Sequence, residues 1–380
     1  MMKRFTQAIG LLLAAALLLP ILGCSQGAAP AGGAPSAPAQ EGTHTIVDHN
    51  GDTVTLPRKV ERIAVCDILP LPSVLAVFFD SAEKIVGMSE TSMSAAKNSL
   101  LAELYPEITK AQTGFINGSE VNVEELLALN PDVVFYNATS AELGEQLKGA
   151  GFNAVAISVN KWDYDAIETL NNWIALLGEI FPENDKTQVV ADYSQRVYDD
   201  IQARVADLTD EQRQRVFFLF KYSESAIMTS GAHFFGQWWA ESVGAVNVAQ
   251  ELTSDNAVQV NMEQVYQWNP EKVLITNFTT AQPEDLYANT VGNYDWQGVA
   301  AVEQRQAHKM PLGMYRSYTP GVDTPMTLLW MAKTIYPDRF ADIDLTAQVQ
   351  DYYQTVFGVS LTDAQAESIF TPPAQAGAGF

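Results

Sequence analysis

Residues 122–134 read NVEELLALNPDVV, and residues 261–273 read NMEQVYQWNPEKV. In both copies an Asn can cap a helix, a Glu lies in the first turn, and apolar residues follow at helical spacing. An Asn-Pro pair then ends the helix ahead of a β-rich run. A chain that repeats a helix, a stop and a strand at this distance is predicted to contain two similar α/β lobes. Two matched lobes imply a cleft between them, and a cleft implies a ligand.

Strands alternate with helices on both sides of the first copy. The pair Asn50-Gly51 between two short alternating segments predicts a β-hairpin over residues 45–56. Further strands are expected at residues 62–65, 84–88, 133–136, 154–158, 215–220, 273–277 and 308–312, and further helices at residues 73–79 and 325–335. This alternation predicts an α/β fold of two Rossmann-like lobes with mainly parallel sheets.

Residues 183–208 interrupt the alternation with one long amphipathic segment. Its apolar face consists of Val190, Tyr193, Val197, Ile201, Val205 and Leu208. We expect one inter-lobe helix of roughly 35 to 40 Å, which places the N-terminal lobe at residues 44–182 and the C-terminal lobe at 209–380. Residues 371–380, with two prolines and several small residues, are expected to be a frayed end.

The start of the chain is typical of an export signal. An apolar segment at residues 8–22 follows a basic pair and is too short to span a bilayer comfortably. It closes on Gly23-Cys24, which resembles a bacterial lipobox, so we expect the signal peptide 1–23 to be removed and Cys24 to carry lipid. The alternative is an ordinary signal peptide in which Cys24 has no role. Residues 24–43 are predicted to be a flexible tether, and the protein is predicted to be anchored on the periplasmic or cell-surface side of a bacterial membrane.

Charge and cysteine content exclude several classes of partner and structure. The formal net charge is −23, with 45 acidic against 22 basic residues, which argues against nucleic acid as a partner. Only two cysteines occur, and with Cys24 lipidated no intramolecular disulfide can form. Cys66 directly follows a predicted strand, where burial is favoured over a place in the cleft.

The order of these motifs resembles the substrate-binding lipoproteins of iron-chelate ABC importers. The resemblance rests on the hairpin at 45–56, the segments 62–65 and 84–87, the first repeat copy, and residues 330–338, which are similar to the family's last helix. It covers essentially the whole chain after the lipobox. It implies two α/β lobes joined by a single rigid helix and a non-enzymatic receptor, expected to be a monomer without a cofactor, whose partner is an ABC permease.

The same resemblance assigns a role to the repeated Glu. In the family, an exposed carboxylate on each lobe meets arginines of the permease, and Glu124 and Glu263 match those positions. A Glu in the first turn of a helix is stabilised by the helix dipole and points into solvent. The alternative is that both are only favourable first-turn residues.

Ligands of doubly wound sheets lie outside the carboxyl ends of the strands, so the loops after each strand are the predicted ligand site. The candidates are Leu69, Glu90, Gly114, Phe115, Tyr136 and Asn137 in the first lobe, and Lys221, Tyr222, His233, Trp238, Asn277, Tyr315, Arg316 and Tyr318 in the second. Trp239 adjoins Trp238, and only one of the two can line the cleft, since neighbouring positions on a helix point in different directions.

Arg316 is the foremost candidate. Its guanidinium, flanked by Tyr315 and Tyr318, suits an anionic ligand with planar oxygen donors such as a catecholate, hydroxamate or carboxylate chelate. The alternative is a solvated surface arginine. His233 and Tyr222 are candidates to fill open coordination positions on a metal, while the alternative for His233 is a cap on the following helix.

The sequence therefore predicts a receptor for an iron(III)-siderophore-type metal chelate. Cobalamin, haem, a nickel chelate or an oxyanion on the same fold are the alternatives. A direct zinc or manganese receptor is disfavoured because the chain contains only four histidines. Alternatives of another class are an exported hydrolase or an adhesin, although the sequence contains no nucleophile elbow, HExxH zinc helix or phosphate loop.

Overall fold

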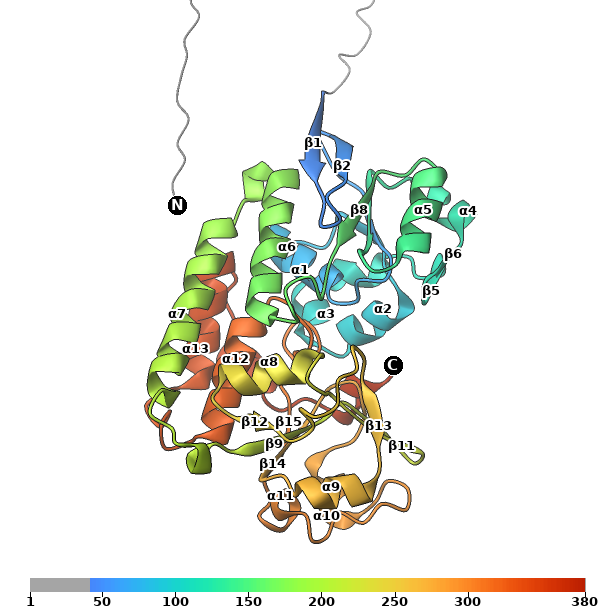
Figure 1. Cartoon of the computed structure of the whole chain (residues 1–380). Coiled ribbons are helices and arrows are strands. Elements are labelled where there is room, and N and C mark those ends of the chain that lie inside the picture. The colour runs from blue at the N-terminus through green and yellow to red at the C-terminus, as the bar shows by residue number, and fades with distance from the viewer. Residues whose placement is uncertain (1–41, 380) are drawn as a thin grey trace, which may run out of the picture. The chain divides into compact units, whose positions relative to one another are not determined.

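Two four-stranded parallel sheets form the framework of residues 42–379, the part of the chain that this computed structural model describes (Figure 1). Their strands are β3 (Ile63–Val65), β4 (Ile85–Gly87), β7 (Val133–Asn137), β8 (Ala154–Ile157), β9 (Arg215–Leu219), β12 (Val246–Asn247), β14 (Lys272–Ile275) and β15 (Ala307–Lys309). The first sheet has the order β4-β3-β7-β8, and the second has the order β12-β9-β14-β15. Counted along the chain, both run second, first, third, fourth. The lobes therefore share one doubly wound topology, and the predicted fold class is confirmed.

Several predictions for the start of the chain cannot be compared with the structure. The signal peptide 1–23, the lipid-bearing Cys24 and nearly all of the tether 24–43 lie outside the described residues. Between residues 42 and 379, no helix combines the length and the apolar character needed to cross a membrane.

The repeated motif folds as the sequence predicts. Its copies form α4 (Val123–Ala128) and α9 (Met262–Trp268). The side chain of Asn122 accepts a hydrogen bond from the backbone of the third helical residue at 3.2 Å, and Asn261 does the same at 2.9 Å. Asn130 and Asn269 adopt left-handed backbone conformations, with φ of 47° and 40°, directly before the prolines. Each copy thus has an Asn cap, a left-handed Asn near the helix end and then a buried strand.

The other helices cover the sheets or lie beside them. They are α1 (Leu71–Phe79), α2 (Glu90–Lys97), α3 (Leu100–Leu104), α5 (Ala141–Gly149), α6 (Ala166–Ile180), α7 (Thr187–Val205), α8 (Phe235–Ser242), α10 (Pro283–Ala288), α11 (Ala300–Glu303), α12 (Thr324–Ile335), α13 (Leu345–Tyr352) and α14 (Asp363–Ser368). A π-helical turn, Tyr353–Phe357, continues α13, and short 3-10 helices occupy Pro106–Lys110, Pro182–Asn184, Asp210–Gln212 and Ala374–Gly377.

Three small antiparallel sheets complete the fold. Their strands are β1 (Thr43–Val47), β2 (Thr53–Pro57), β5 (Ile116–Asn117), β6 (Glu120–Val121), β10 (Lys221–Ser223), β11 (Ala226–Thr229) and β13 (Val258–Val260). β1 pairs with β2 in the register Val47 to Thr53, and Gly51 has a φ of 85° in the turn. The predicted Asn-Gly hairpin is therefore confirmed.

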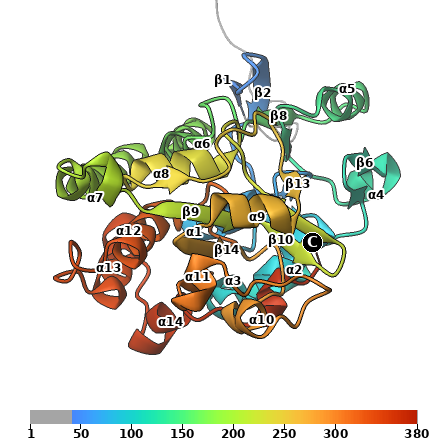
Figure 2. The same cartoon turned by 60° about the horizontal axis from the view of Figure 1, so that its bottom comes forward.

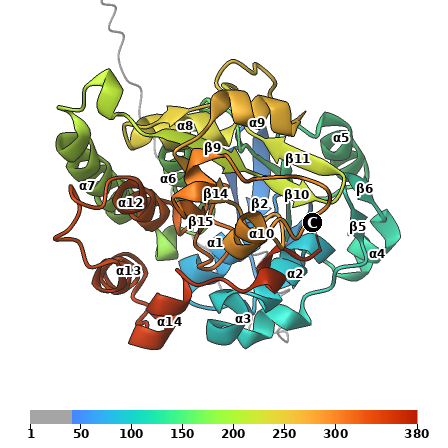
Figure 3. The same cartoon turned by 90° about the horizontal axis from the view of Figure 1, so that it is seen from below.

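Helix α7 is the long amphipathic helix expected between the lobes. It is shorter at both ends than residues 183–208, because a 3-10 turn precedes it and the chain leaves the helix after Val205, and at 1.5 Å per residue it is roughly 28 Å long. The predicted apolar face is buried along its whole length. Helices α7 and α12 pack together, and Figure 3 shows α7, α12 and α13 nearly end-on.

One hydrophobic core joins elements of both lobes. It includes Leu75 of α1, Trp173 of α6, Val197 of α7 and Met331 of α12. Each lobe also has a smaller core on the other face of its sheet. Cys66 is fully buried, as expected, and burial raises the pKa of its thiol.

The prediction of a frayed end is wrong for the described part of residues 371–380. Ala376 and Gly377 are buried, and the segment Ala374–Gly377 forms a 3-10 turn. The reason is tertiary, because these small residues pack against the second lobe around Thr279. The composition of the segment gave no indication of this packing.

We predict that His49 makes the protein less stable as the pH falls from 6.5 towards 4. Its Nδ1 accepts a hydrogen bond from Ser158 N at 3.0 Å, and burial, helped by the charge of Lys161, lowers its pKa to about 4. In this range the unfolded chain binds a proton that the native imidazole does not, so the free energy of unfolding decreases with falling pH. His49→Gln should lose about 1–2 kcal/mol less than wild type between pH 7 and 4 in urea titrations. Parallel curves for the two proteins would contradict the assignment.

Candidate functional site

The loop between β15 and α12 lies where the two lobes meet. Leu100 N of α3 donates a hydrogen bond to Gly313 O at 3.1 Å, and Ser99 Oγ donates to Met314 O at 3.2 Å. The first-lobe helix α3 and this second-lobe loop are thus in direct contact. The loop carries Arg316, so the residue ranked first from the sequence is at the inter-lobe boundary.

Asp323, the residue before α12, holds this loop in shape. Its carboxylate accepts hydrogen bonds from Met314 N at 2.8 Å, from Tyr315 N at 3.4 Å and from the Tyr353 hydroxyl at 2.5 Å. A Cβ at Gly313 would stand 1.9 Å from Asp323 Oδ1, so the close approach requires glycine. Burial raises the pKa of Asp323, while these donors oppose the shift.

Arg316 is buried, with none of its surface exposed, and so is not the solvated arginine that was the alternative. Its Nε donates to Ala376 O at 3.2 Å and its Nη2 to Ala378 O at 2.7 Å. The guanidinium also lies 5.2 Å from the centre of the Phe278 ring. A cation buried to this degree is stable only when its donors are satisfied.

Two lysines add positive charge around Arg316. Burial and the charge of Arg316 lower the pKa of Lys221. Burial lowers the pKa of Lys309 to about 7, with the opposing charge of Asp285 and then the charge of Arg316 as smaller causes. Lys309 Nζ donates to the carbonyl oxygens of residues 276, 279 and 281 at 2.7 to 2.9 Å. These cations destabilise one another's charge, and a bound anion would relieve that repulsion.

A cavity of about 550 Å³ opens beside this group. Its lining consists of Lys221, Tyr222, Ser223, Ala226, Met228, Phe278, Thr279, Thr280, Gly377, Ala378 and Gly379. Two of the predicted ligand residues, Lys221 and Tyr222, line it, and Arg316 adjoins it through the tail carbonyls. The volume is in the usual range for a small-molecule site.

The two predicted tyrosines beside Arg316 have different surroundings. Tyr315 is buried next to the guanidinium, and burial raises the pKa of its hydroxyl against the opposing charge of Arg316. The Tyr318 ring packs in an aromatic cluster with Phe218, Phe220 and Phe235, and its hydroxyl hydrogen-bonds Ser230. Tyr318 therefore belongs to the core beneath the cleft.

In the first lobe, three predicted residues lie at strand or helix ends. Leu69 is half-buried and its carbonyl accepts from Ser92 Oγ at 2.8 Å. Glu90 is exposed at the start of α2, and Asn137 ends β7. None of the three lines the cavity beside Arg316, so their role in ligand binding stays a prediction.

Two further first-lobe candidates are core residues and a third is a surface glycine. Phe115 and Tyr136 are buried in the smaller core of that lobe, and Tyr136 fits so closely against α5 that a Cβ at Gly144 would meet its ring at 2.5 Å. Gly114 is exposed, near the Glu125 carboxylate. These residues were selected by the strand-end rule, that is, the expectation that ligands bind beyond the carboxyl ends of the strands. The rule uses only position in the sequence and does not predict the direction in which a side chain points.

The two predicted metal ligands, Tyr222 and His233, have different surroundings, and their role as ligands stays a prediction. The Tyr222 hydroxyl accepts a hydrogen bond from Trp296 Nε1 at 2.8 Å and donates to Val291 O at 3.2 Å. The His233 side chain is 58% exposed and lies 3.5 Å from Asp255, and no side chain caps α8. Within residues 42–379 no group of three His, Cys, Asp or Glu side chains is arranged to hold a metal ion.

The remaining two candidates of the second lobe support its structure. Asn277 is buried, and its Nδ2 donates to Met310 O and Pro311 O, both at 2.8 Å, which fixes the start of the Arg316 loop. Trp238 is half-buried, whereas Trp239 is buried and donates to Tyr318 O at 2.9 Å. The expectation that only one of these tryptophans can face the cleft agrees with this difference.

The sequence reasoning did not select Phe278, Lys309 or Ser94, which lie at this centre. Phe278 could have been found, because it directly follows the predicted strand 273–277, whereas Lys309 lies inside the predicted strand 308–312 and ends only the observed β15. Ser94 of α2 donates its hydroxyl to Ala378 O at 3.1 Å. No local signal distinguishes Ser94 from Ser92, the other serine of that helix.

These features define a two-lobed α/β binding protein with a cationic centre between its lobes. The chain matches the family described as Periplasmic binding protein over residues 71–311, and it belongs to that family. It is 28% identical over 341 residues to the molybdate-binding protein MolA of Haemophilus influenzae, covering 83% of this chain and 91% of MolA. MolA with molybdate bound has a similar structure, with a TM-score of 0.69 and 25% identity over 84% of this chain and 99% of that one.

Two other relatives agree with this placement. A periplasmic solute binding protein of Veillonella parvula superposes with a TM-score of 0.77 and 26% identity, covering 87% of this chain and 97% of its own. An uncharacterized ABC transporter substrate-binding lipoprotein of Bacillus subtilis, YvrC, is 23% identical over 304 residues, which are 78% of this chain and 87% of YvrC. The protein is a substrate-binding protein of an ABC importer.

We predict that Asp323→Ala lowers the free energy of unfolding by about 2–4 kcal/mol, because it leaves two buried backbone N–H groups and the Tyr353 hydroxyl without their acceptor. Urea denaturation measures the change. The control is Asp338→Ala at an exposed position of the same lobe, expected within about 0.5 kcal/mol of wild type. Equal effects of the two substitutions would show that Asp323 does not hold the loop.

Proposed function

We propose that this protein captures an anionic metal compound beside Arg316 and delivers it, without chemical change, to the permease of an ABC importer. The observation that carries the proposal is the group formed by buried Arg316, buried Lys309 and half-buried Lys221 in a chain with a net charge of −23. Cations gathered in a largely water-excluded place favour an anion, because the attraction is weakly screened there. The carbonyl oxygens that Arg316 now contacts carry only partial charge, so an anionic oxygen would be a stronger acceptor.

The first candidate ligand is an iron(III)-siderophore-type chelate, as predicted from the sequence. Support comes from the adjoining cavity of about 550 Å³, whose lining includes Phe278 and Tyr222 beside Lys221. Planar catecholate or carboxylate oxygens suit a guanidinium, and aromatic rings provide apolar contact area.

The second candidate is a small oxyanion of the molybdate type. The observation in its favour is the likeness to MolA, which extends over 83% of this chain. A tetrahedral oxyanion needs several strong donors at close range, and Arg316 with the neighbouring lysines can supply them after a local rearrangement.

We predict that Arg316→Lys weakens ligand binding by about 10- to 100-fold, because lysine lacks the forked donors that meet two oxygens at once. Titrations of a ferric catecholate, a ferric hydroxamate and sodium molybdate, followed by tryptophan fluorescence and calorimetry, measure the loss. The control Arg305→Lys changes an arginine that is 68% exposed in the same lobe and should bind as wild type does. Equal affinity of the two variants would remove Arg316 from the site, and hydrolytic activity without binding of any probe would favour an enzyme.

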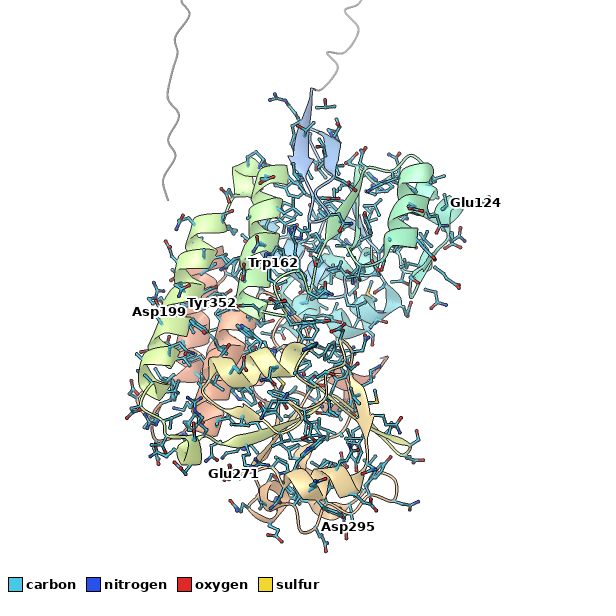
Figure 4. All side chains as sticks on the ribbon, in the orientation of Figure 1. Glu124, Trp162, Asp199, Glu271, Asp295 and Tyr352 are labelled. Atoms are coloured by element: carbon cyan, nitrogen blue, oxygen red, sulfur yellow. The ribbon has the colours of Figure 1, made fainter. Side chains whose placement is uncertain are left out.

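The proposed permease contact uses the repeated helices. Glu124 and Glu263 are both exposed in the first turns of α4 and α9, and Figure 4 shows Glu124 at the outer edge of its lobe.

An exposed apolar residue follows each of these carboxylates by three positions: Leu127 is 51% exposed and Tyr266 is 42% exposed. These two and Val47 are the large exposed hydrophobic residues among those described. In Figure 2, α9 comes to the front of the second lobe. Each lobe thus offers a carboxylate and an apolar side chain one turn apart, which suits a protein partner.

We predict that the double variant Glu124→Ala, Glu263→Ala reduces permease-dependent uptake at least about tenfold while ligand affinity is unchanged, because each carboxylate would lose a charged partner. Uptake of the radiolabelled ligand by cells or proteoliposomes measures the effect. The matched control replaces Glu142 and Glu284, which are exposed first-turn residues of α5 and α10 outside the repeat. Wild-type uptake by the first variant, or equal loss in both, would contradict docking through the repeat.

We also propose that Cys24 carries the lipid anchor and that residues 44–182, 183–208 and 209–380 are the N-terminal lobe, the connecting segment and the C-terminal lobe. The naming of the relative YvrC as a lipoprotein supports the anchor. A tether of small residues would let the folded body reach the permease while it stays at the membrane.

A further inference from the structure

The segment that follows α14 is buried at Ala376 and Gly377 and reaches the centre of the proposed site before Gly379 is exposed again. Residues 374–379 pass over the loop at Thr279 and Thr280 and come to lie between Lys221 of β10 and Ser94 of α2. Figure 3 shows the end of the chain close to β10 and α2. We call residues 374–379 the tail segment.

One carbonyl group of the tail segment joins the two lobes. Ala378 O accepts a hydrogen bond from Arg316 Nη2 of the second lobe at 2.7 Å and another from Ser94 Oγ of the first lobe at 3.1 Å. Ala376 O accepts from Arg316 Nε at 3.2 Å. The tail segment therefore uses hydrogen-bond donors from both lobes.

Gly377 lets the tail segment approach this closely. A Cβ at Gly377 would lie 2.1 Å from the backbone C and O atoms of Thr279 and 2.6 Å from Thr280 N. These are backbone atoms, so no side-chain rotation can make room. Any larger residue at position 377 must move the tail segment away from its seat.

We propose that the tail segment is an intramolecular occupant of the ligand site, which an incoming anion must displace from Arg316. This rests on the proposed function. In the unliganded protein the tail carbonyls satisfy donors of a buried guanidinium, which removes the cost of leaving them unpaired. An anion offers the same donors a full negative charge. The tail segment and the ligand therefore compete for the same donors of Arg316. Release of the tail segment also breaks the hydrogen bond between Ser94 Oγ and Ala378 O.

The competition lowers the apparent affinity of the site. Because the tail is tethered, its local concentration is high even though its carbonyls are weak acceptors. The measured dissociation constant equals the intrinsic constant divided by the fraction of molecules with the tail displaced. A variant in which the tail segment cannot contact Arg316 should therefore bind the anion more tightly.

The test compares Gly377→Ala with Gln375→Ala in the full chain. Gln375 is exposed in the same turn, so its replacement leaves the seat intact. Amide hydrogen exchange over residues 374–379 reports the seating of the tail without any ligand, and titration with sodium molybdate and a ferric catecholate reports affinity. We expect faster exchange and on the order of tenfold tighter binding for Gly377→Ala only, and faster exchange of the wild-type tail when a probe is bound.

The outcomes separate the two proposals. Equal affinity of Gly377→Ala and wild type would overturn the competition while leaving the proposed function standing. Weaker binding by Gly377→Ala would also overturn it, because the tail would then be part of the binding surface. Failure of both probes to bind either protein would contradict the proposed function, and the competition with it.

Discussion

The charge of Arg316 has to be satisfied in a place that water does not reach. This requirement connects parts of the chain that are remote in sequence. Asp323 shapes the loop that carries Arg316, Asn277 fixes the start of that loop, and the tail carbonyls accept from the guanidinium. A neutral side chain at position 316 would remove the electrostatic reason for this arrangement. The site is therefore also a structural centre of the second lobe.

The shared topology of the lobes explains how the same chain can present a ligand site and two similar outer helices. In each lobe the repeated helix leads into the third strand, which pairs with the first strand of that sheet. α4 and α9 thus occupy equivalent positions, with Glu124 and Glu263 at matching places in their first turns. The core that joins α1, α6, α7 and α12 holds elements of both lobes together, which opposes a wide hinge motion and favours binding with small adjustments.

The strand-end rule illustrates how far local reasoning reaches. It selected Arg316, Lys221 and Tyr222, and it also selected Phe115, Tyr136 and Tyr318, which are core residues. Tyr136 lies in β7, Lys221 and Tyr222 lie in β10, Phe115 directly precedes β5, and Arg316 and Tyr318 lie in the loop after β15, so position relative to the strands does not separate the two groups. Whether such a side chain faces the cleft or the core depends on twist, on the loop path and on the helices packed behind it, and none of these is encoded within a few neighbouring residues.

The sequence by itself determined the repeated unit, its Asn caps, its Asn-Pro stops, the buried strands and the amphipathic face of α7, because each depends on neighbours within one or two helical turns. Only the tertiary structure decided that Arg316 is buried and that the last residues described line the cavity beside it. The tail hydrogen bonds of Arg316 join residues 60 and 62 positions apart, and that of Ser94 spans 284 positions. Contacts over such separations depend on how the lobes pack. The composition of residues 371–379, which are mostly small residues and prolines, does not predict which part of the protein they contact.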